Sequence, residues 1–412
     1  MAKALFLGLP LHGHTNPSLP LVRALVERGD EVVYFSSEAF AAGIQQAGAQ
    51  YRPYRNAFLA DLRQLPEQTN EISWLLMRTV GEVLAQDLGA FRAERPDYVI
   101  TDSVAPWGQW VAQVLEVPVV TSVTTFAFNR HVLALGAARG TRPKSVRLVL
   151  SKIRHVTKAA LLGRRLRREH RVKGTGMMGL VMGCSDLNIV YTSRFFQPCA
   201  ESFDDRFQFI GPPMGPRTEA VDFPWDEASQ TDVIYVSLGT LFNADPTFYR
   251  TCFEAFRAQN VRVVMSIGTT ITEASLGAPP ANVVVRPHVP QLKVLRRATV
   301  FVSHGGMNSV SESLSHGVPL VCVPQMGEQE IVAGQVEALG AGLRLAKGEV
   351  TAHRLRESVQ RVLDDERFRQ QAAVVRESFE ASGGAARGAE AILAFTRHRA
   401  TSRSVGPGPW GG

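Results

Sequence analysis

The sequence predicts an α/β protein with two doubly wound domains that face each other across a cleft. Strand-length apolar runs alternate with helix-length segments, which is typical of parallel sheets with helical crossovers. This alternation stops at residues 211–230, a stretch rich in Pro, Gly and charge, and then begins again. The chain has 412 residues, of which 45% are apolar, so it is too long for one ordinary core and suits two domains.

The first domain is predicted to span residues 1–210. Its strand candidates are ALFLGLP, EVVYFSS, YVITDS, PVVTSVT, LNIVYTS and FQFIG. After the first candidate, PSLPLVRALVERG has helical periodicity and ends at Gly29, a typical helix stop. We expect this helix to begin at Asn16-Pro17-Ser18, because a proline near the first helical position needs no partner for its missing N–H.

Residues 211–230 are predicted to form an interdomain linker, and residues 231–385 a second domain. The strand candidates of this domain are DVIYVSLGT, VRVVMSIG, NVVVRPHVP, TVFVSHGG, PLVCVP and GLRL. A helical tail follows from about Thr351 to Arg399. Residues 386–412 hold the end of this tail and the stretch TSRSVGPGPWGG, which has no core-forming pattern and is predicted to be disordered.

Composition narrows the class of protein. No uncharged apolar run is long enough to predict a transmembrane helix. The start, MAKALFLGLPL, is similar to a signal peptide, but its apolar run ends in HGHTNP and not in a small-residue cleavage site, so we interpret it as a strand. The cysteines have no paired spacing, which favours reduced thiols in the cytoplasm over disulfides or a zinc site. They are Cys184, Cys199, Cys252 and Cys322.

Positive charge is concentrated in residues 139–173. This segment holds 13 Lys and Arg and one acid, Glu169, although the net charge of the whole chain is only +7. Nucleic-acid binding is disfavoured, because the segment has almost no aromatic residues and no recognisable reading helix. Two interpretations stay open: a solvated helical face, or peripheral contact with an anionic membrane near lipophilic substrates.

A Gly-rich turn follows the strand candidate TVFVS. His304, Gly305 and Gly306 form the turn, and Asn308 and Ser309 fall where a helix would begin. Such a turn directs free backbone N–H groups and the positive end of the helix dipole at one point, which suits a phosphate. Taken alone, the pattern equally suits an ordinary strand–helix turn with Asn or Ser as its N-cap.

The flanking segments make this pattern specific. RPHVPQLKVL lies upstream and GVPLVCVPQMGEQ lies downstream. Together with VSLGT and the opening HGHTNPS, they resemble the nucleotide-sugar signature of glycosyltransferase family one, in particular its bacterial macrolide glycosyltransferase branch. The resemblance covers nearly the whole chain and implies the GT-B architecture, in which two Rossmann-like domains face each other across a cleft.

The resemblance also implies a donor site for a nucleotide sugar. His288 stands where the plant signature usually has a Trp, and Glu328 where the family often has an Asp. Val289 and Gln291 would lie against the base and ribose, Glu312 would bind the ribose, and Gln329 favours glucose. The implied donor-binding residues are Ser237, Gly239, Thr240, His288, Val289, Gln291, His304, Gly306, Asn308, Ser309, Glu312, Glu328 and Gln329.

Sugar transfer to an alcohol needs a base that works near neutral pH, and histidine fits best. The stretch GLPLHGHTNPSLPLVRAL offers His12 and His14, and Asp102 follows another strand of the same domain. The ends of parallel strands gather at one edge, so Asp102 can orient a histidine there. The family's GHxNP pattern assigns the base to His14 and its partner to Asp102. A metal site is disfavoured, because the first half offers no convincing third ligand.

Apolar residues of the first domain are the candidates for acceptor binding. Trp74, Met77, Phe126 and Phe128 lie in stripes that suit either a core or the wall of a pocket for a lipophilic molecule, and the sequence leaves both open.

The sequence therefore predicts an inverting glycosyltransferase. It would move a hexose, glucose from a UDP-sugar, to a hydroxyl of a small lipophilic natural product such as a macrolide, a flavonoid or another phenol or alcohol. We expect it to need no cofactor and no metal, and to bind no nucleic acid. The alternatives are a lipid-linked sugar transferase or nucleotide-sugar epimerase of the same fold, or a non-catalytic protein that binds an aglycone or a UDP-sugar.

Overall fold

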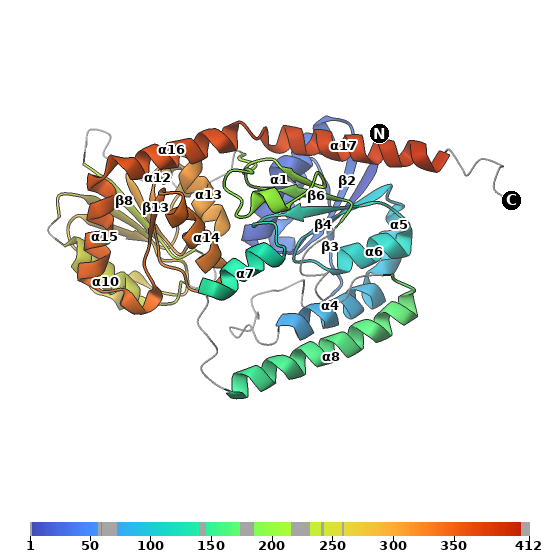
Figure 1. Ribbon diagram of the computed structural model, residues 1–412, viewed down its shortest axis with the longest axis horizontal. Coiled ribbons are helices and arrows are strands. Elements are labelled where there is room, and N and C mark those ends of the chain that lie inside the picture. The colour runs from blue at the N-terminus through green and yellow to red at the C-terminus, as the bar shows by residue number, and fades with distance from the viewer. Residues whose placement is uncertain are drawn as a thin grey trace.

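The computed structural model describes residues 2–56, 59, 72–139, 146–173, 185–215, 231–239, 243–257 and 259–404. It contains two parallel β-sheets, each flanked by helices on both faces (Figure 1). The fold class expected from the sequence is confirmed.

The first sheet is entirely parallel, with the strand order β3-β2-β1-β4-β5-β6-β7. Its strands are β1 (Lys3–Leu7), β2 (Glu31–Ser36), β3 (Gln50–Pro53), β4 (Tyr98–Asp102), β5 (Val119–Val123), β6 (Leu187–Val190) and β7 (Phe207–Phe209). The helices around it are α1 (His12–Glu27), η1 (Glu38–Phe40), α2 (Ala41–Gln46), α4 (Ile72–Gln86), α5 (Leu88–Glu94), α6 (Trp107–Leu115), α7 (Arg130–Arg139), α8 (Val146–His170) and η4 (Ala200–Ser202).

The second sheet is also parallel, with the order β10-β9-β8-β11-β12-β13. Its strands are β8 (Val233–Ser237), β9 (Arg262–Ser266), β10 (Val283–Arg286), β11 (Val300–Ser303), β12 (Leu320–Cys322) and β13 (Gly342–Arg344). The helices are α10 (Pro246–Phe256), α11 (Glu273–Leu276), α12 (Gln291–Leu295), α13 (Met307–Ser315), α14 (Gly327–Ala338), η5 (Lys347–Glu349), α15 (Ala352–Asp364), α16 (Glu366–Glu380) and α17 (Gly384–Ser404).

Two local expectations need correction. Strand β3 was not expected, because QYRP has no apolar alternation and three of its four residues are exposed on the sheet edge. Helix α1 begins at His12, not at Asn16, so Pro17 lies inside the helix. The chain can enter this helix early because Leu11 has the extended backbone of an N-cap residue and its carbonyl accepts from the N–H groups of His14 and Thr15.

Each sheet is covered by buried apolar side chains on both faces. In the first domain α1, α2 and α17 cover one face, and α4, α5 and α6 cover the other. The apolar cluster of the second domain continues into the first, where the ring of Phe196 meets the edge of Phe379 from α16 at 5.6 Å between centroids. The two domains are therefore joined by a packed apolar contact as well as by the chain.

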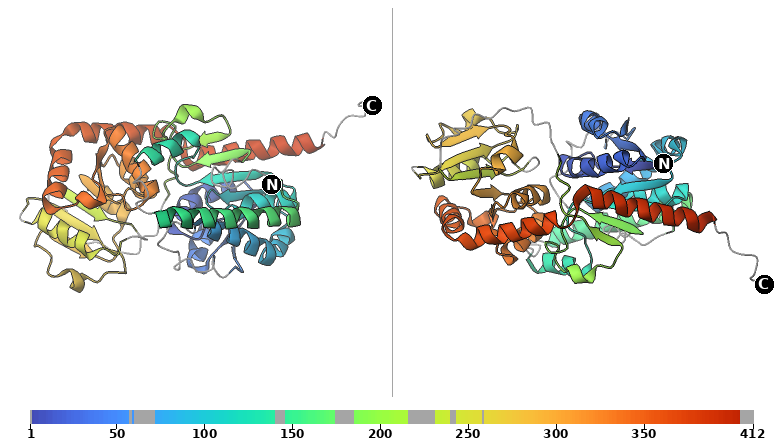
Figure 2. Two further views of the ribbon diagram at one scale, coloured as in Figure 1. Left: turned by 60° about the horizontal axis from the view of Figure 1, so that its bottom comes forward. Right: turned by 90° about the horizontal axis from the view of Figure 1, so that it is seen from above.

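The last helix returns to the first domain. Helix α17 runs along α1 (Figures 1 and 2), and Gly388 lies so close to Leu21 and Ile210 that a Cβ atom there would be 2.9–3.0 Å from them. The Arg399 guanidinium pairs with Asp186 at 2.6 Å. The segment predicted to be disordered falls partly in α17, which reaches Ser404, and residues 405–412 lie outside the described residues.

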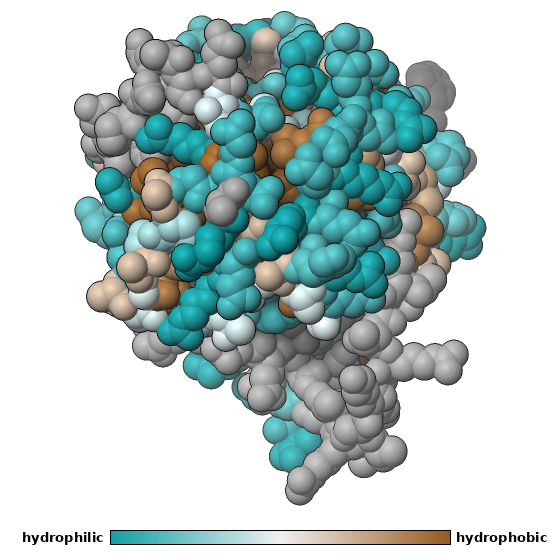
Figure 3. Space-filling model, turned by 90° about the vertical axis from the view of Figure 1, so that its left-hand side faces the viewer, coloured by the Kyte–Doolittle hydropathy of each residue, from teal (hydrophilic) through white to brown (hydrophobic). Residues whose placement is uncertain are grey.

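The outer face of the second domain, at the left of Figure 1, is mainly hydrophilic, with apolar side chains visible between polar ones and at its rims (Figure 3). Among the described residues, no helix is both long and apolar enough to cross a membrane.

Candidate functional site

The site is built where each sheet reverses its strand order. In the first sheet this point lies between β1 and β4, and in the second between β8 and β11. Loops that leave such neighbouring strands diverge in opposite directions and open a crevice at the carboxyl edge, where open α/β sheets bind ligands. His14 follows β1 and Asp102 ends β4, while Ser237 ends β8 and His304 follows β11. Sequence-predicted residues thus occupy both points.

His14 and Asp102 are in direct contact. The Nδ1 atom of His14, in the first turn of α1, lies 2.9 Å from Asp102 Oδ2 and 3.0 Å from Thr124 Oγ1. The other carboxylate oxygen of Asp102 accepts from the Val104 N–H at 2.8 Å, which fixes the carboxylate. We assign the Nδ1 proton to the bond with Asp102, so Nε2 is left with a lone pair and can act as a base.

The surroundings of His14 raise its pKa. Its side chain is only 16% exposed, and this burial by itself lowers the pKa, but the charge and hydrogen bond of Asp102 and the charge of Glu328 outweigh it. Glu328 lies in the first turn of α14, in the other domain. Its own pKa is raised by burial, which His14 opposes and Asp102 reinforces. Glu328 therefore contributes charge to the surroundings of the histidine from the opposite domain.

The Gly-rich turn after β11 encloses the His304 ring. Gly305 has φ +76°, a conformation that favours glycine. A Cβ atom on Gly239 would lie 2.6 Å from the His304 ring, and one on Gly306 would also overlap it, so both glycines make room for the imidazole. Burial lowers the pKa of His304 to about 4, opposed by a hydrogen bond with the Ser237 backbone. The ring is therefore neutral at pH 7, so any hydrogen bond that it donates to a ligand comes from an uncharged imidazole.

Helix α13 presents an uncapped N-terminus. Gly306 is its N-cap residue, so no side chain caps it, and its first turn holds no acid. Asn308 and Ser309 therefore do not serve as the N-cap, the structural alternative that the sequence left open. The first backbone N–H groups of the helix have no acceptor within it and can bind an anion.

Gln291 and Glu312 form one hydrogen-bonded chain. Gln291 Nε2 donates to Glu312 Oε2 at 2.6 Å, and the Tyr235 hydroxyl donates to Gln291 Oε1 at 2.9 Å. Glu312 is only 3% exposed. The structure thus brings together the two residues that the resemblance places beside the ribose.

The remaining candidates for donor binding follow strands at the carboxyl edge of the second sheet. His288 is exposed and Val289 is half-buried, in the loop between β10 and α12. Gln329 is buried, and its Oε1 accepts from the Gln325 N–H at 2.8 Å, which leaves its Nε2 as the donor for a ligand. Thr240 lies outside the described residues.

The four acceptor candidates divide by burial. Met77 and Phe126 are 3% and 1% exposed, and Met77 packs against Gly163 of α8 while Phe126 packs against Phe196. These two side chains contribute to the core. Trp74 and Phe128 are half-buried, so they retain surface for a ligand, and their role in acceptor binding stays a prediction.

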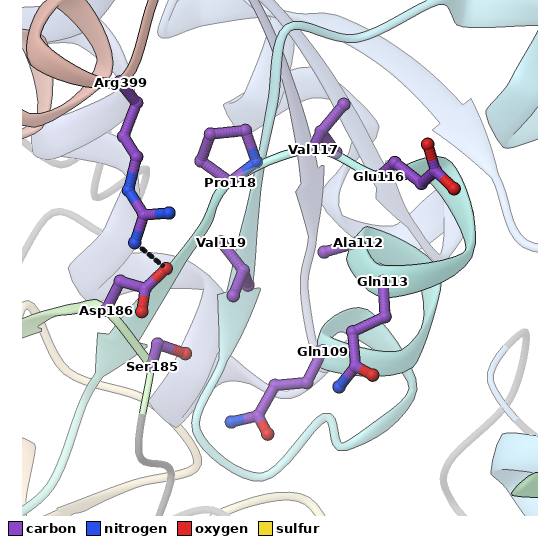
Figure 4. A pocket seen from close by; sticks show the side chains of 10 residues that line it. All are labelled: Gln109, Ala112, Gln113, Glu116, Val117, Pro118, Val119, Ser185, Asp186 and Arg399. Atoms are coloured by element: carbon purple, nitrogen blue, oxygen red, sulfur yellow. Dashed lines mark hydrogen bonds and ion pairs between the residues drawn. The ribbon is translucent and has the colours of Figure 1, made fainter. Parts of the chain in front are cut away.

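A separate cavity of about 380 Å³ lies at the opposite, amino edge of the first sheet. Figure 4 shows that Val119, Ser185 and Asp186 line it, with the Arg399 guanidinium held by Asp186. None of the predicted site residues lines this cavity. Among the described residues, no group of three or more His, Cys, Asp or Glu side chains could hold a metal ion.

Two side chains of the site and one backbone carbonyl, that of Gly13, were missed in the sequence. Thr124, which contacts His14, follows a strand of the same sheet, so its position at the carboxyl edge was a usable signal. Tyr235 lies within the buried strand β8, where its hydroxyl has no sequence signal. Asn308 Nδ2 donates across the domains to the Gly13 carbonyl at 2.8 Å, a contact that only the three-dimensional arrangement shows.

Comparison with known proteins identifies the family of the chain. A family model described as erythromycin biosynthesis protein CIII-like, C-terminal domain, matches residues 254–390. The NDP-glycosyltransferase YjiC of Bacillus subtilis is 37% identical over 96% of this chain and 97% of its own length. The demethyllactenocin mycarosyltransferase of Streptomyces fradiae is 33% identical over 95% and 86%, respectively.

Solved structures give the same result. The glycotransferase of kitacinnamycin has a TM-score of 0.81 and 30% identity, covering 95% of this chain and 98% of its own. The calicheamicin glycosyltransferase CalG4 has a TM-score of 0.78 and 29% identity, covering 96% and 98%. The chain belongs to the bacterial macrolide-type branch of glycosyltransferase family one, and it is a glycosyltransferase with the GT-B fold.

Proposed function

We propose that this enzyme transfers a hexose, glucose from a UDP-sugar, to a hydroxyl of a small lipophilic natural product, with inversion at the anomeric carbon. The observation that carries the proposal is the contact of His14 with Asp102 beside the uncapped N-terminus of α13, whose Asn308 reaches the Gly13 carbonyl next to His14. A candidate base and a candidate anion site, from different domains, thus lie side by side. This is the arrangement that a direct displacement requires.

The reaction would proceed in one step. His14 Nε2 takes the proton of the acceptor hydroxyl while the hydroxyl oxygen forms a bond to the anomeric carbon. The bond from that carbon to the diphosphate oxygen breaks, and the electron pair leaves with the diphosphate. The N–H groups of α13, and the neutral His304 ring, would stabilise the charge that develops there. Because attack and departure occur on opposite sides of the carbon, its configuration inverts.

The choice of donor rests on residue types and on relatives. The carboxylate of Glu328 and the amide of Gln329 can hydrogen-bond sugar hydroxyls. One relative, 32% identical, is an uncharacterized UDP-glucosyltransferase, YojK of Bacillus subtilis, whereas another is a mycarosyltransferase. We therefore propose glucose and UDP, with a macrolide, flavonoid or other phenol or alcohol as the acceptor.

The test is to incubate the protein with UDP- and TDP-sugars and a panel of hydroxylated aglycones, with EDTA present, and to read mass shifts. We expect a product heavier by one hexose, formed from UDP-glucose without added metal, since the helix N-terminus and neutral donors would hold the diphosphate. Tight acceptor binding without product from any donor would contradict transfer. A product formed only with added metal would contradict the metal-free mechanism.

Replacing Glu312 by Gln is expected to weaken donor binding about tenfold or more, because a hydrogen bond to a charged group contributes about 1.5–3 kcal/mol. The variant retains the shape of the side chain but lacks the carboxylate that would accept from the ribose hydroxyls. Calorimetric titration with UDP measures the effect. Glu349→Gln, which removes an exposed acid of the same domain, is the control. Equal UDP affinity of E312Q and the wild type would refute the ribose role.

We also propose that residues 139–173 rest on anionic membrane, as the charge of the segment suggested. Helix α8 packs along α4 on the outside of the first domain (Figures 1 and 2), with Ala159 and Leu166 buried against it. The opposite face carries the α8 basic stripe, which runs at helical spacing along the helix. It consists of Arg154, Lys158, Leu161, Arg165 and Arg168.

The composition of the α8 basic stripe favours lipid over nucleic acid. Leu161 is 59% exposed at the centre of the stripe, and among the described residues none of its four basic side chains forms an ion pair. Basic side chains around an exposed leucine match a surface of anionic headgroups over acyl chains. A phosphate backbone would bind the charges but would leave the leucine without an apolar partner.

Sedimentation with vesicles tests this contact. Vesicles with about one third phosphatidylserine should bind the wild type at low salt, and R165Q/R168Q should weaken binding about thirtyfold, since each basic residue contributes about 1 kcal/mol. Leu161→Gln should weaken it several-fold. R354Q/R369Q, which removes two exposed charges from the second domain, should change little. Absence of binding, equal losses in both double variants, or insensitivity to L161Q would contradict the proposal.

A cytoplasmic location is part of the proposal. It rests on the scattered cysteines, of which Cys199, Cys252 and Cys322 are free thiols in the described residues.

A further inference from the structure

Pro17 leaves a backbone carbonyl of α1 without its usual partner. In an α-helix the carbonyl of residue 13 accepts from the N–H of residue 17, four positions later. Helix α1 runs from His12 to Glu27 with Pro17 inside it, and proline has no N–H to donate. The Gly13 carbonyl therefore lacks its helical hydrogen bond, although it lies within the helix and directly beside His14.

A residue of the other domain donates to that carbonyl instead. Asn308 Nδ2, from the first turn of α13, donates to the Gly13 oxygen at 2.8 Å. Because Asn308 does not cap its own helix, its side chain is available for this contact. The hydrogen bond spans 295 positions of sequence and joins the N-terminal turns of two helices that belong to different sheets.

From this geometry we propose that Asn308 and the Gly13 carbonyl form an interdomain latch that positions His14 against the donor. The proposal rests on the glycosyl transfer described above. An amide nitrogen carries two hydrogens, so Asn308 can donate one to Gly13 and the other to a donor phosphate oxygen. The base is then aligned when the diphosphate is bound. Pro17 is a positioning residue in this latch, because it prevents the helix from taking up the carbonyl.

Replacing Pro17 by Ala tests the latch without touching Asn308. The alanine N–H would compete for the Gly13 carbonyl, and a helix-interior Pro→Ala change favours the helix, so folding should be retained. We expect kcat to fall roughly three- to tenfold, the effect of one displaced hydrogen bond, while the UDP dissociation constant rises less than in Asn308→Ala, which also removes the amide that would donate to the phosphate. Pro20→Ala, the same change at the other proline of α1, is the matched control and should retain kcat.

A double-mutant cycle separates the latch from a general effect on α1. Asn308→Ala should lower kcat and also weaken UDP binding, and adding P17A to it should lower kcat no further, because both changes remove the same contact. Additive losses, equal losses in P17A and P20A, or unchanged kcat in P17A would overturn the latch.

A readout that needs no turnover distinguishes failure of the latch from failure of the proposed function. UDP should protect the backbone amides of the first turns of α1 from hydrogen exchange in the wild type, and this protection should be lost in P17A. Its presence in both proteins, or its absence from the wild type, would overturn the latch whether or not a glycoside is formed.

Discussion

Replacing His14 by alanine is expected to lower kcat about 100-fold or more, the usual contribution of a general base. The variant lacks the only ring nitrogen that the contacts with Asp102 and Thr124 leave for the acceptor proton. UDP affinity should change little, because the diphosphate would be held by the other domain. Initial rates at saturating donor and acceptor, with calorimetric titration of UDP, measure both quantities.

His12→Ala is the matched control for this variant. The His12 side chain is exposed and lies edge-on to Phe40, with 5.0 Å between ring centroids. Its removal should leave kcat near the wild-type value. Wild-type turnover of H14A, or equal losses in H14A and H12A, would refute the assignment of the base to His14.

Replacing Asp102 by asparagine is expected to lower kcat by about 10- to 100-fold and to displace the pH–rate profile, because the carboxylate orients the imidazole and stabilises its protonated form. In the wild type the pKa of His14 is raised above its ordinary value of 6.5 although burial lowers it, mainly because of Asp102. The rate should therefore fall as the pH drops through this raised pKa, since the protonated ring cannot accept a proton.

Loss of the Asp102 carboxylate should shift the acid-side decrease in rate to lower pH. With the charge of Asp102 removed, burial dominates and the pKa of His14 decreases, so a smaller maximal rate persists further into the acid range. Thr124→Val, which removes the neutral contact to the same nitrogen, is the control and should leave the acid limb in place. If the acid limb of D102N coincides with that of the wild type, Asp102 does not set the pKa of the base.

Regular elements were predictable where burial gives a strong pattern. Strands β4 and β8 are buried at every position, and their apolar runs are recognisable in the sequence. Strand β3 is mostly exposed at a sheet edge, so its pairing with β2 rather than its own residues decides its structure. The start of α1 was misplaced because a proline usually marks the first turn of a helix. In the structure Pro17 is instead the sixth residue of α1.

The site was predictable where strand ends determine it. His14 follows β1 and Asp102 ends the neighbouring strand β4, so their contact follows from topology. The chain of Tyr235, Gln291 and Glu312 depends on side-chain reach, and the contact of Asn308 with Gly13 depends on how the two domains are placed. No spacing in a single sequence contains either piece of information.

The configuration of the product tests the mechanism most directly. The enzyme is given an α-linked nucleotide glucose and a phenolic acceptor in the presence of EDTA, and the anomeric proton of the purified glycoside is examined by NMR. We expect a β-glycoside that H14A does not form at an appreciable rate, as a single displacement by an acceptor deprotonated at His14 requires. An α-glycoside, or a β-glycoside formed equally fast by H14A, would contradict it.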